Sequence, residues 1–412
     1  MNSFIKDNQY YKFSAYGFLK NLRFFDAFFI IFLFANNMSY TQIGILYAVR
    51  EIIINVFEIP SGIIADSYGR KTSLVASLII YLISFGVFYM STSFWLYMLA
   101  FSLYGIADAF RSGTHKGMMM DYLKLNNWSD HKILYYGHTR SWSQKGSAIS
   151  SLIAGILVYY SGNYQNIFLY SMIPYLINLL VVLSYPKEVN YALKKKGGNV
   201  RLTTKSLIHT LRQPNVIKLI NTTALHSAYL KSIKDYIQPL LINIAILIPF
   251  FIETEPEKKN GLFIGVFYFI IYLITSHASK YSSKTASKSY KNIPYTTLII
   301  GFMAGILSGV FYVNNLWILS VIFFVAVYYI ENLRKPILTG YVSDHVPNEI
   351  LTSVLSVQSL LKTAITAILA LAFGLIADNF GIGISLIAVS LSLLTINTII
   401  NLSIKKSSIR NI

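Results

Sequence analysis

The stretch Gly62-Ile63-Ile64-Ala65-Asp66-Ser67-Tyr68-Gly69-Arg70-Lys71 is a short polar loop between two long apolar segments. Glycine allows tight turns and a close approach of neighbouring helices. An aspartate at a helix end accepts hydrogen bonds from free backbone amides and faces the positive end of a helix dipole. The two basic residues favour the cytoplasmic side of a membrane. The loop therefore predicts a cytoplasmic junction between two membrane helices.

The rest of the chain is apolar enough to make both neighbours membrane spans. The mean hydropathy is +0.52, and only 13% of the 412 residues are charged. A helix needs about 20 apolar residues to cross the hydrocarbon core. The apolar runs are too long for a β-barrel, which leaves helices as the spanning structure. We predict an all-α integral membrane protein with twelve transmembrane helices, at 14–36, 43–65, 73–91, 94–115, 138–160, 166–185, 215–248, 260–277, 293–313, 316–333, 350–377 and 382–404.

The distribution of positive charge predicts the topology. The formal net charge is +18, but with a cytoplasmic N-terminus the outer loops contain only Lys258 and Lys259 among the basic residues. This pattern follows the positive-inside rule and favours contact with anionic headgroups over nucleic-acid binding. We expect a multi-pass protein of the cell (inner or plasma) membrane, with both termini cytoplasmic and no cleavable signal peptide. The chain has no cysteine, which excludes disulfides and thiolate metal sites.

The longest polar stretch between predicted spans divides the chain in two. It runs from Tyr185 to Pro214 and contains Lys194-Lys195-Lys196. We predict an N-terminal six-helix half at 1–185, a basic cytoplasmic linker at 186–214 and a C-terminal six-helix half at 215–412. Two equivalent halves are typical of secondary transporters. A shorter polar segment, 116–137, is predicted to hold an amphipathic helix on the membrane surface.

The opening loop, Gly62-x-x-x-Asp66-x-x-Gly69-Arg70-Lys71, and the preceding Glu58-Ile59-Pro60-Ser61 resemble the loop between the second and third spans of the major facilitator superfamily. The resemblance implies two six-helix bundles, transport by alternating access, and a loop that holds the cytoplasmic face in one state. The implied conformational-gate residues are Gly62, Asp66, Gly69, Arg70 and Lys71, with Asp108 and Arg111 of the fourth span as a latch. The second-half loop, 276–292, lacks the signature, and the fifth span lacks the glycine-proline pattern of drug antiporters.

Many polar and ionisable residues fall inside the predicted spans. Such groups cost several kcal/mol in lipid unless they face a cavity or a partner. They recur at helical spacing, which places them on single helix faces. The cavity candidates are Arg23, Asp26, Arg50, Glu51, Asn55, Glu58, Arg140, Gln144, Lys145, His226, Lys231, Lys234, Asp235, Gln238, Gln358 and Lys362. Two alternatives stay open for them: pairing between helices, or a position nearer the cytoplasmic surface.

The seventh span is the most polar, and Pro239 is predicted to break it. Interrupted helices often line transporter sites. Candidates for a coupling proton are Glu51, Asp26, Asp235 and Glu58, because desolvation raises a carboxyl pKa toward neutrality. Cations outnumber acids in the predicted cavity, which favours an anionic or zwitterionic substrate.

The motifs of enzymes are missing from the sequence. There is no Gly-x-x-x-x-Gly-Lys phosphate loop and no histidine pair at zinc-ligand spacing. We therefore expect a transporter and not an enzyme, without cofactor or metal, which acts as a monomer with the lipid bilayer, a small-molecule substrate and protons as its partners. Two main alternatives remain: a multidrug efflux proton antiporter, and a non-transporting membrane sensor on the same fold. A membrane-embedded enzyme acting on lipid is a third.

Overall fold

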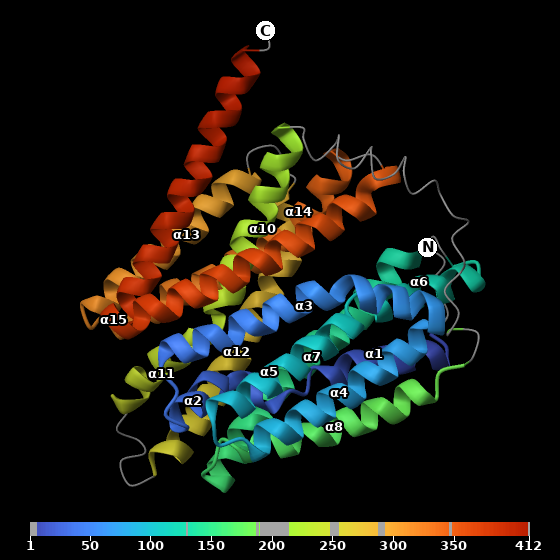
Figure 1. Ribbon diagram of the computed structural model, residues 1–412, viewed down its shortest axis with the longest axis horizontal. Helices are drawn as coiled ribbons and strands as arrows, with labels where there is room; N and C mark the ends of the chain where they lie inside the picture. The colour runs from blue at the N-terminus through green and yellow to red at the C-terminus, as the bar shows by residue number, and fades with distance from the viewer. Residues whose placement is uncertain are drawn as a thin grey trace. The chain divides into compact units, whose positions relative to one another are not determined.

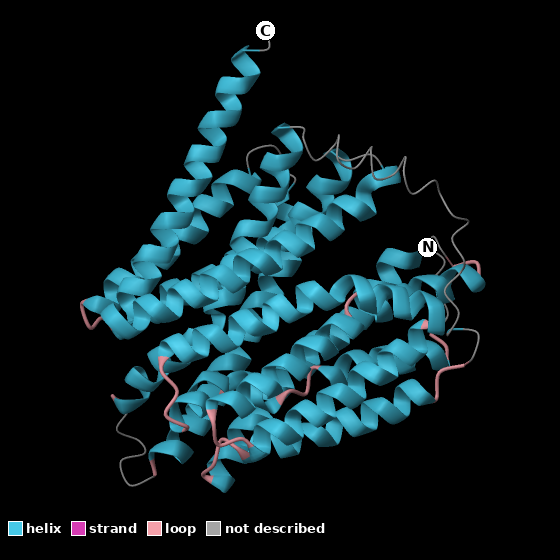
Figure 2. Cartoon of the chain, in the orientation of Figure 1, coloured by secondary structure: helices cyan, strands magenta, loops and turns pink. Residues whose placement is uncertain are grey.

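The computed structural model describes residues 6–128, 131–186, 189, 214–247, 255–286, 293–345 and 348–410. Every regular element within these ranges is a helix, and Figure 2 shows the loops as short connections. Most of the predicted linker, 186–214, lies outside the described residues.

The chain divides into two compact units. Unit 1 comprises Met1–Met38, Val49–Lys194 and Ala245–Tyr272, and unit 2 comprises Ser39–Ala48, Lys195–Ile244 and Leu273–Ile412. The helices wholly in unit 1 are α1 (Asn8–Lys20), η1 (Phe24–Ala27), α2 (Phe29–Ala35), α4 (Arg70–Met90), α5 (Phe94–Arg111), α6 (Thr114–Leu125), α7 (Lys132–Ser161) and α8 (Asn166–Leu183). Those of unit 2 are α10 (Pro214–Ile233), η4 (Lys234–Tyr236), α13 (Ile293–Val313), α14 (Trp317–His345) and α15 (Asn348–Arg410). The remaining helices, α3 (Tyr40–Tyr68), α11 (Ile237–Ile246) and α12 (Pro256–Ala286), each contribute residues to both units.

Two predicted spans are interrupted by 3₁₀ turns. The first was expected as one helix over 14–36, but α1 ends at Lys20 and the chain passes through η1 before α2 begins. The seventh is interrupted at η4 and not at Pro239, which lies in the first turn of α11. Proline is tolerated in a first turn because its missing N–H would have no helical partner there. The break therefore precedes the proline.

The last two predicted spans are two helices that meet at a sharp turn and together carry the label α15 (Asn348–Arg410). Gly381 in α15 has φ +83°, a conformation that favours glycine. Figure 1 shows the two limbs of α15 meeting near its label. The turn falls between the predicted spans 350–377 and 382–404.

The exposure of side chains along α3 is that of a membrane helix. Glu51 is 0% exposed, whereas its neighbour Ile52 is 53% exposed. Val56, Ile59 and Ile63 continue the exposed apolar stripe. Polar groups inside and apolar groups outside are what lipid solvation requires. Six helical segments in the described part of the chain are long and apolar enough to cross a bilayer.

Close helix packing in unit 2 depends on glycines of α13. A Cβ at Gly301 would lie 2.0 Å from Nε2 of His226, and one at Gly305 would lie 2.0 Å from the Tyr229 hydroxyl. In unit 1, a Cβ at Gly155 of α7 would lie 2.9 Å from the Gly261 carbonyl of α12. Small residues at such crossings let membrane helices approach closely.

Candidate functional site

The interruption of the first span positions an ion pair. The Arg23 guanidinium lies 2.9 Å from the Asp26 carboxylate, and both side chains are about three-quarters buried. The guanidinium also donates a hydrogen bond of 2.6 Å to the Tyr104 hydroxyl on α5. Because the backbone leaves the helix here, the Phe24 N–H is free to bond to the Ser171 hydroxyl of α8, 3.1 Å away. Side chains of other helices thus stabilise the break, through one of its charged side chains and through one of its backbone N–H groups.

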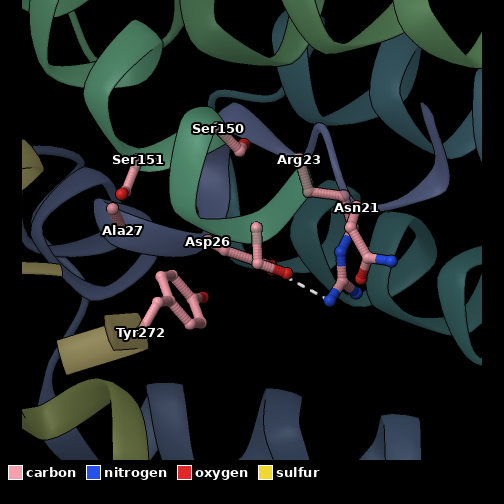
Figure 3. Close-up of a pocket in the computed structure, with 8 residues that line it drawn as sticks. Asn21, Arg23, Asp26, Ala27, Ser150, Ser151 and Tyr272 are labelled. Atoms are coloured by element: carbon pink, nitrogen blue, oxygen red, sulfur yellow. Dashed lines mark ion pairs between the residues drawn. The ribbon is translucent and has the colours of Figure 1, made fainter. Parts of the chain in front are cut away.

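A pocket within unit 1 opens beside this pair. It has about 190 Å³ of empty space, part of it open to solvent. Figure 3 shows the Asp26 carboxylate between the Arg23 guanidinium and the Tyr272 ring of α12. The lining residues are Asn21, Arg23, Asp26, Ala27, Ser147, Ser150, Ser151 and Tyr272. The pocket therefore combines one cation, one carboxylate and several hydroxyl groups.

The remaining candidates on α7 extend the serine face of the pocket. Arg140, Gln144, Ser147 and Ser151 follow one another at three- and four-residue intervals, so they share one helix face. Arg140 is exposed and Gln144 is partly buried. Lys145 points elsewhere, because its ammonium lies 4.8 Å from the centre of the Trp142 ring.

A second ion pair lies on α3. The Arg50 guanidinium is 3.0 Å from the carboxylate of Glu51. It also lies 6.0 Å from the centre of the Tyr104 ring, so Tyr104 contacts both Arg23 and Arg50. Asn55 and Glu58, one and two turns further on, are partly buried. One phenol therefore connects the charged groups of the first and second spans.

The interruption of the seventh span repeats the arrangement of the first. The Asp235 carboxylate lies 2.8 Å from the Lys234 ammonium and accepts a hydrogen bond of 2.7 Å from the Tyr47 hydroxyl. The Lys234 carbonyl, freed by the 3₁₀ turn, accepts a bond of 2.6 Å from the Tyr328 hydroxyl of α14. Each interruption thus holds a cation–carboxylate pair and a tyrosine hydroxyl.

The other unit 2 candidates are spread along three helices. Gln238 is buried at the start of α11, and Lys231 is partly buried near the end of α10. Gln358 and Lys362 of α15 are one turn apart and partly buried. His226 is fully buried, with its Nδ1 atom 2.7 Å from the carboxylate of Glu331 on α14.

The partners of His226 were missed from the sequence. The tenth span was predicted to end at residue 333, yet α14 continues to His345 and Arg334 is buried inside the unit. The Arg334 guanidinium donates to the Pro294 carbonyl at 2.6 Å and to the Thr222 carbonyl at 2.7 Å. The signal in the sequence was the helical spacing of Glu331 and Arg334, which matches that of the candidates on other spans.

The motif expected as a loop is mostly helical, since α3 continues to Tyr68 and α4 begins at Arg70, and it contacts other helix ends in unit 1. Only Gly69, with φ +95°, separates α3 from α4. The Arg70 guanidinium lies 2.6 Å from the Asp121 carboxylate of α6. The Lys71 ammonium donates to the carbonyls of Leu183 and Tyr185, at 2.7 and 2.6 Å, and so caps the C-terminal end of α8.

Two expected contributions of the motif are not found as stated. Gly62 provides no close helix approach, since a Cβ there would meet no described atom within 4 Å. The Asp66 side chain lies outside the described residues. Asp108 and Arg111 pair with each other at 2.6 Å, and the Tyr81 hydroxyl donates to Asp108. The described contact of Asp108 and Arg111 is therefore within the fourth span.

A helical membrane fold with charged pairs at two broken spans is typical of polytopic transporters. The sequence matches the family model described as Major Facilitator Superfamily over residues 17–370. The chain belongs to this superfamily of secondary transporters and is not an enzyme.

Individual relatives are distant. The chain is 23% identical over 395 residues to the uncharacterized MFS-type transporter YxaM of Bacillus subtilis, which covers 93% of this chain and 92% of the relative. The fold is similar to that of the nucleoside transporter NupG, with a TM-score of 0.74, 13% identity, and coverage of 97% and 100% of the two chains. It is also similar to an inward-facing, unoccupied bacterial homolog of the human lysosomal transporter Spinster, with a TM-score of 0.71, 15% identity, and coverage of 97% and 98%.

Proposed function

We propose that this protein is a proton-coupled secondary transporter of a small zwitterionic or anionic solute. The observation that carries the proposal is the ion pair at each interrupted span, Arg23–Asp26 at η1 and Lys234–Asp235 at η4. Broken helices at corresponding positions of two halves are typical of transporter binding sites, because the freed backbone groups and charges line a cavity. The first and seventh spans are such positions in a chain of two six-helix halves.

The chemistry of the unit 1 pocket supports a zwitterionic solute. The guanidinium of Arg23 is suited to a carboxylate, which it binds with two parallel donors. The Asp26 carboxylate is suited to an ammonium group of the same solute. The Ser150 hydroxyl has no partner among the described residues, and the Ser147 and Ser151 hydroxyls, which donate to carbonyls of α7, keep lone pairs that can accept. Binding of the solute then replaces the Arg23–Asp26 contact with two contacts of similar kind.

The transport cycle that we propose is alternating access. The halves 1–185 and 215–412, joined by the linker 186–214, alternate between two states, and the 62–71 motif stabilises one of them. Solute and proton shift the equilibrium only through their different affinities for the two states. The excess of basic residues on one side supports cytoplasmic termini in a cell membrane. We propose that one chain is sufficient.

The test is solute-driven proton movement in proteoliposomes that hold a pH-sensitive dye. The panel contains amino acids, organic anions, sugars and cationic drugs. We expect flux with a zwitterionic or anionic member, and its loss in Asp26→Asn. Glu255→Gln serves as the matched control, because the Glu255 side chain is 66% exposed and lies outside the pocket. Equal flux in wild type and Asp26→Asn contradicts the assignment of the pocket.

The same panel separates the alternatives. Flux with cationic drugs alone identifies an efflux antiporter and contradicts the proposed substrate class. Labelled-solute uptake without proton movement contradicts proton coupling, and uptake that requires a sodium gradient identifies the replacement ion. If no member of the panel gives either uptake or proton flux, the result favours a sensor.

A further inference from the structure

The proposed function leaves a second buried titratable cluster without a role. His226 of α10 is 0% exposed and Glu331 of α14 is 1% exposed. The imidazole Nδ1 lies 2.7 Å from one carboxylate oxygen, and the Ser227 hydroxyl donates to the other. Burying an ionisable pair is costly, and apolar residues of similar size often serve stability as well. The pair therefore needs an explanation beyond packing.

The charged residues around the pair are either engaged elsewhere or face solvent. The terminal nitrogens of Arg334 donate to the Thr297 hydroxyl at 2.6 Å and to two carbonyl groups, and its buried Nε makes no hydrogen bond to a described residue. The Lys335 ammonium is 3.9 Å from Glu331, and its side chain is 51% exposed. Of the remaining packed helices, α13 presents Gly301 to the ring, and Tyr229 on the next turn of α10 bonds to Ser390 of α15 at 2.6 Å. Lys335 is therefore the exposed charged neighbour of this buried carboxylate.

The second imidazole nitrogen is poised to exchange a proton. Nε2 of His226 is buried and makes no hydrogen bond to any residue that the structure describes. Gly301 leaves room for this atom, because any side chain there would collide with it. With Nδ1–H donating to Glu331, Nε2 retains its lone pair. The pair then accepts one proton, either as imidazolium–carboxylate or as imidazole–carboxylic acid.

The same two helices connect this pair to the interruption of the seventh span. Tyr328 and Glu331 are one turn apart on α14. Tyr328 bonds to the Lys234 carbonyl in η4, and Glu331 bonds to His226 and Ser227 of α10. Protonation alters one of these α10–α14 contacts, and the neighbouring contact holds the 3₁₀ turn at which Asp235 lies.

We propose that His226 and Glu331 form the proton-binding site through which protonation is coupled to the η4 turn. This inference rests on the proposed proton-coupled function. It assigns the coupling proton to unit 2, whereas the solute pocket described above lies in unit 1. Arg334 is a positioning residue in this scheme, since it fixes α14 against α13 and α10.

The first experiment uses protons alone as the probe. Infrared difference spectra of the full chain in lipid nanodiscs are recorded as the pH is lowered. We expect a titrating carboxylic-acid C=O band that is missing in Glu331→Gln, or a titrating imidazolium ring band that is missing in His226→Asn, with the same band present in wild type and Glu255→Gln. Asparagine keeps a donor near the position of Nδ1 but cannot take up a proton. A titrating band that survives in both Glu331→Gln and His226→Asn, or neither band in wild type, overturns the inference.

The second experiment uses the panel solute that drives proton flux in wild type. We expect Glu331→Gln to lower solute-driven proton flux by about tenfold or more while solute exchange stays within about twofold of wild type. Proton flux that is retained in Glu331→Gln overturns only the inference about this pair and leaves the proposed function intact. Wild-type transport without proton movement overturns both. If Glu331→Gln fails to fold, as judged by gel filtration, the same readings are taken on His226→Asn.

Discussion

The Asp378 carboxylate of α15 accepts a hydrogen bond of 2.7 Å from the Thr41 backbone N–H, in the first turn of α3. Its other oxygen accepts from the Tyr40 N–H at 2.8 Å. A residue far along the chain therefore caps the start of the second span, where four N–H groups have no partner within the helix. The cap belongs to unit 2, in which Gly374 of α15 also meets the Tyr40 carbonyl.

Removal of this cap should destabilise unit 2. Loss of an N-cap carboxylate costs about 1 kcal/mol of unfolding free energy. We expect Asp378→Ala to lower the thermal midpoint of the purified protein in detergent, measured by intrinsic fluorescence, and Asp378→Asn to lower it less. The adjacent Asn379→Ala is the control, since Asn379 bonds only to Leu375 of its own helix in the described contacts. An equal shift in both alanine variants would count against the cap.

The glycine that faces His226 gives a second stability prediction. In a helix, Gly→Ala ordinarily stabilises by up to about 1 kcal/mol. A Cβ at Gly86 of α4 would meet no described atom within 4 Å, so Gly86→Ala should raise the thermal midpoint. Gly301→Ala should lower it, because the new methyl group would overlap the imidazole. The same substitution is thus expected to act in opposite directions. A rise in both variants would contradict the packing of Gly301 against His226.

The contact between Arg70 and Asp121 is suited to a double-mutant cycle. The two side chains are only partly exposed, and the guanidinium also packs over Gly117. We expect a coupling energy of roughly 1 kcal/mol between Arg70→Ala and Asp121→Ala, measured from unfolding in denaturant. Lys71→Ala paired with Asp121→Ala supplies the control, because Lys71 bonds to carbonyls at the end of α8. Additive losses in the first cycle would show that the loop does not hold α6 through this pair.

Hydropathy was sufficient to predict where most spans lie. The ninth predicted span, 293–313, has the same bounds as α13, and the fourth begins at residue 94 in both. A run of apolar residues carries this information because transfer into lipid depends on the summed composition of a segment. The family followed from the 62–71 loop and its place between two spans.

Hydropathy could not predict the interruption of the first span. Phe24, Phe25 and Phe28 keep the mean hydropathy of the segment high through η1, so Arg23 and Asp26 indicated a charged face of one helix and not a break. The break depends on partners from other helices, such as the Ser171 hydroxyl that bonds to the Phe24 N–H. A sequence read along one segment contains no information about which distant groups will satisfy its backbone.

Charged residues also led to a wrong prediction of where the tenth span ends. In the sequence, Glu331 and Arg334 indicate the end of a membrane segment, because an unpartnered charge in lipid is costly. In the structure, His226 and the carbonyls of Thr222 and Pro294 satisfy them, so the helix continues. The pairing of charges across helices therefore decides where such a span ends, and pairing is a tertiary property.

The phenol of Tyr104 provides the last prediction. Its hydroxyl accepts a hydrogen bond from Arg23, and its ring faces Arg50. Tyr104→Phe keeps the ring but removes one hydrogen bond from the Arg23 guanidinium, which still pairs with Asp26, and loss of one hydrogen bond to a charged group costs about 1.5 kcal/mol or more. We expect a KM for solute-driven proton flux that is raised by about tenfold. In Tyr97→Phe, the control on the same helix, only a bond to the Ser91 carbonyl is lost, and KM should stay unchanged. If Tyr104→Phe also leaves KM unchanged, the hydrogen bond from Arg23 to Tyr104 does not orient the guanidinium for solute binding.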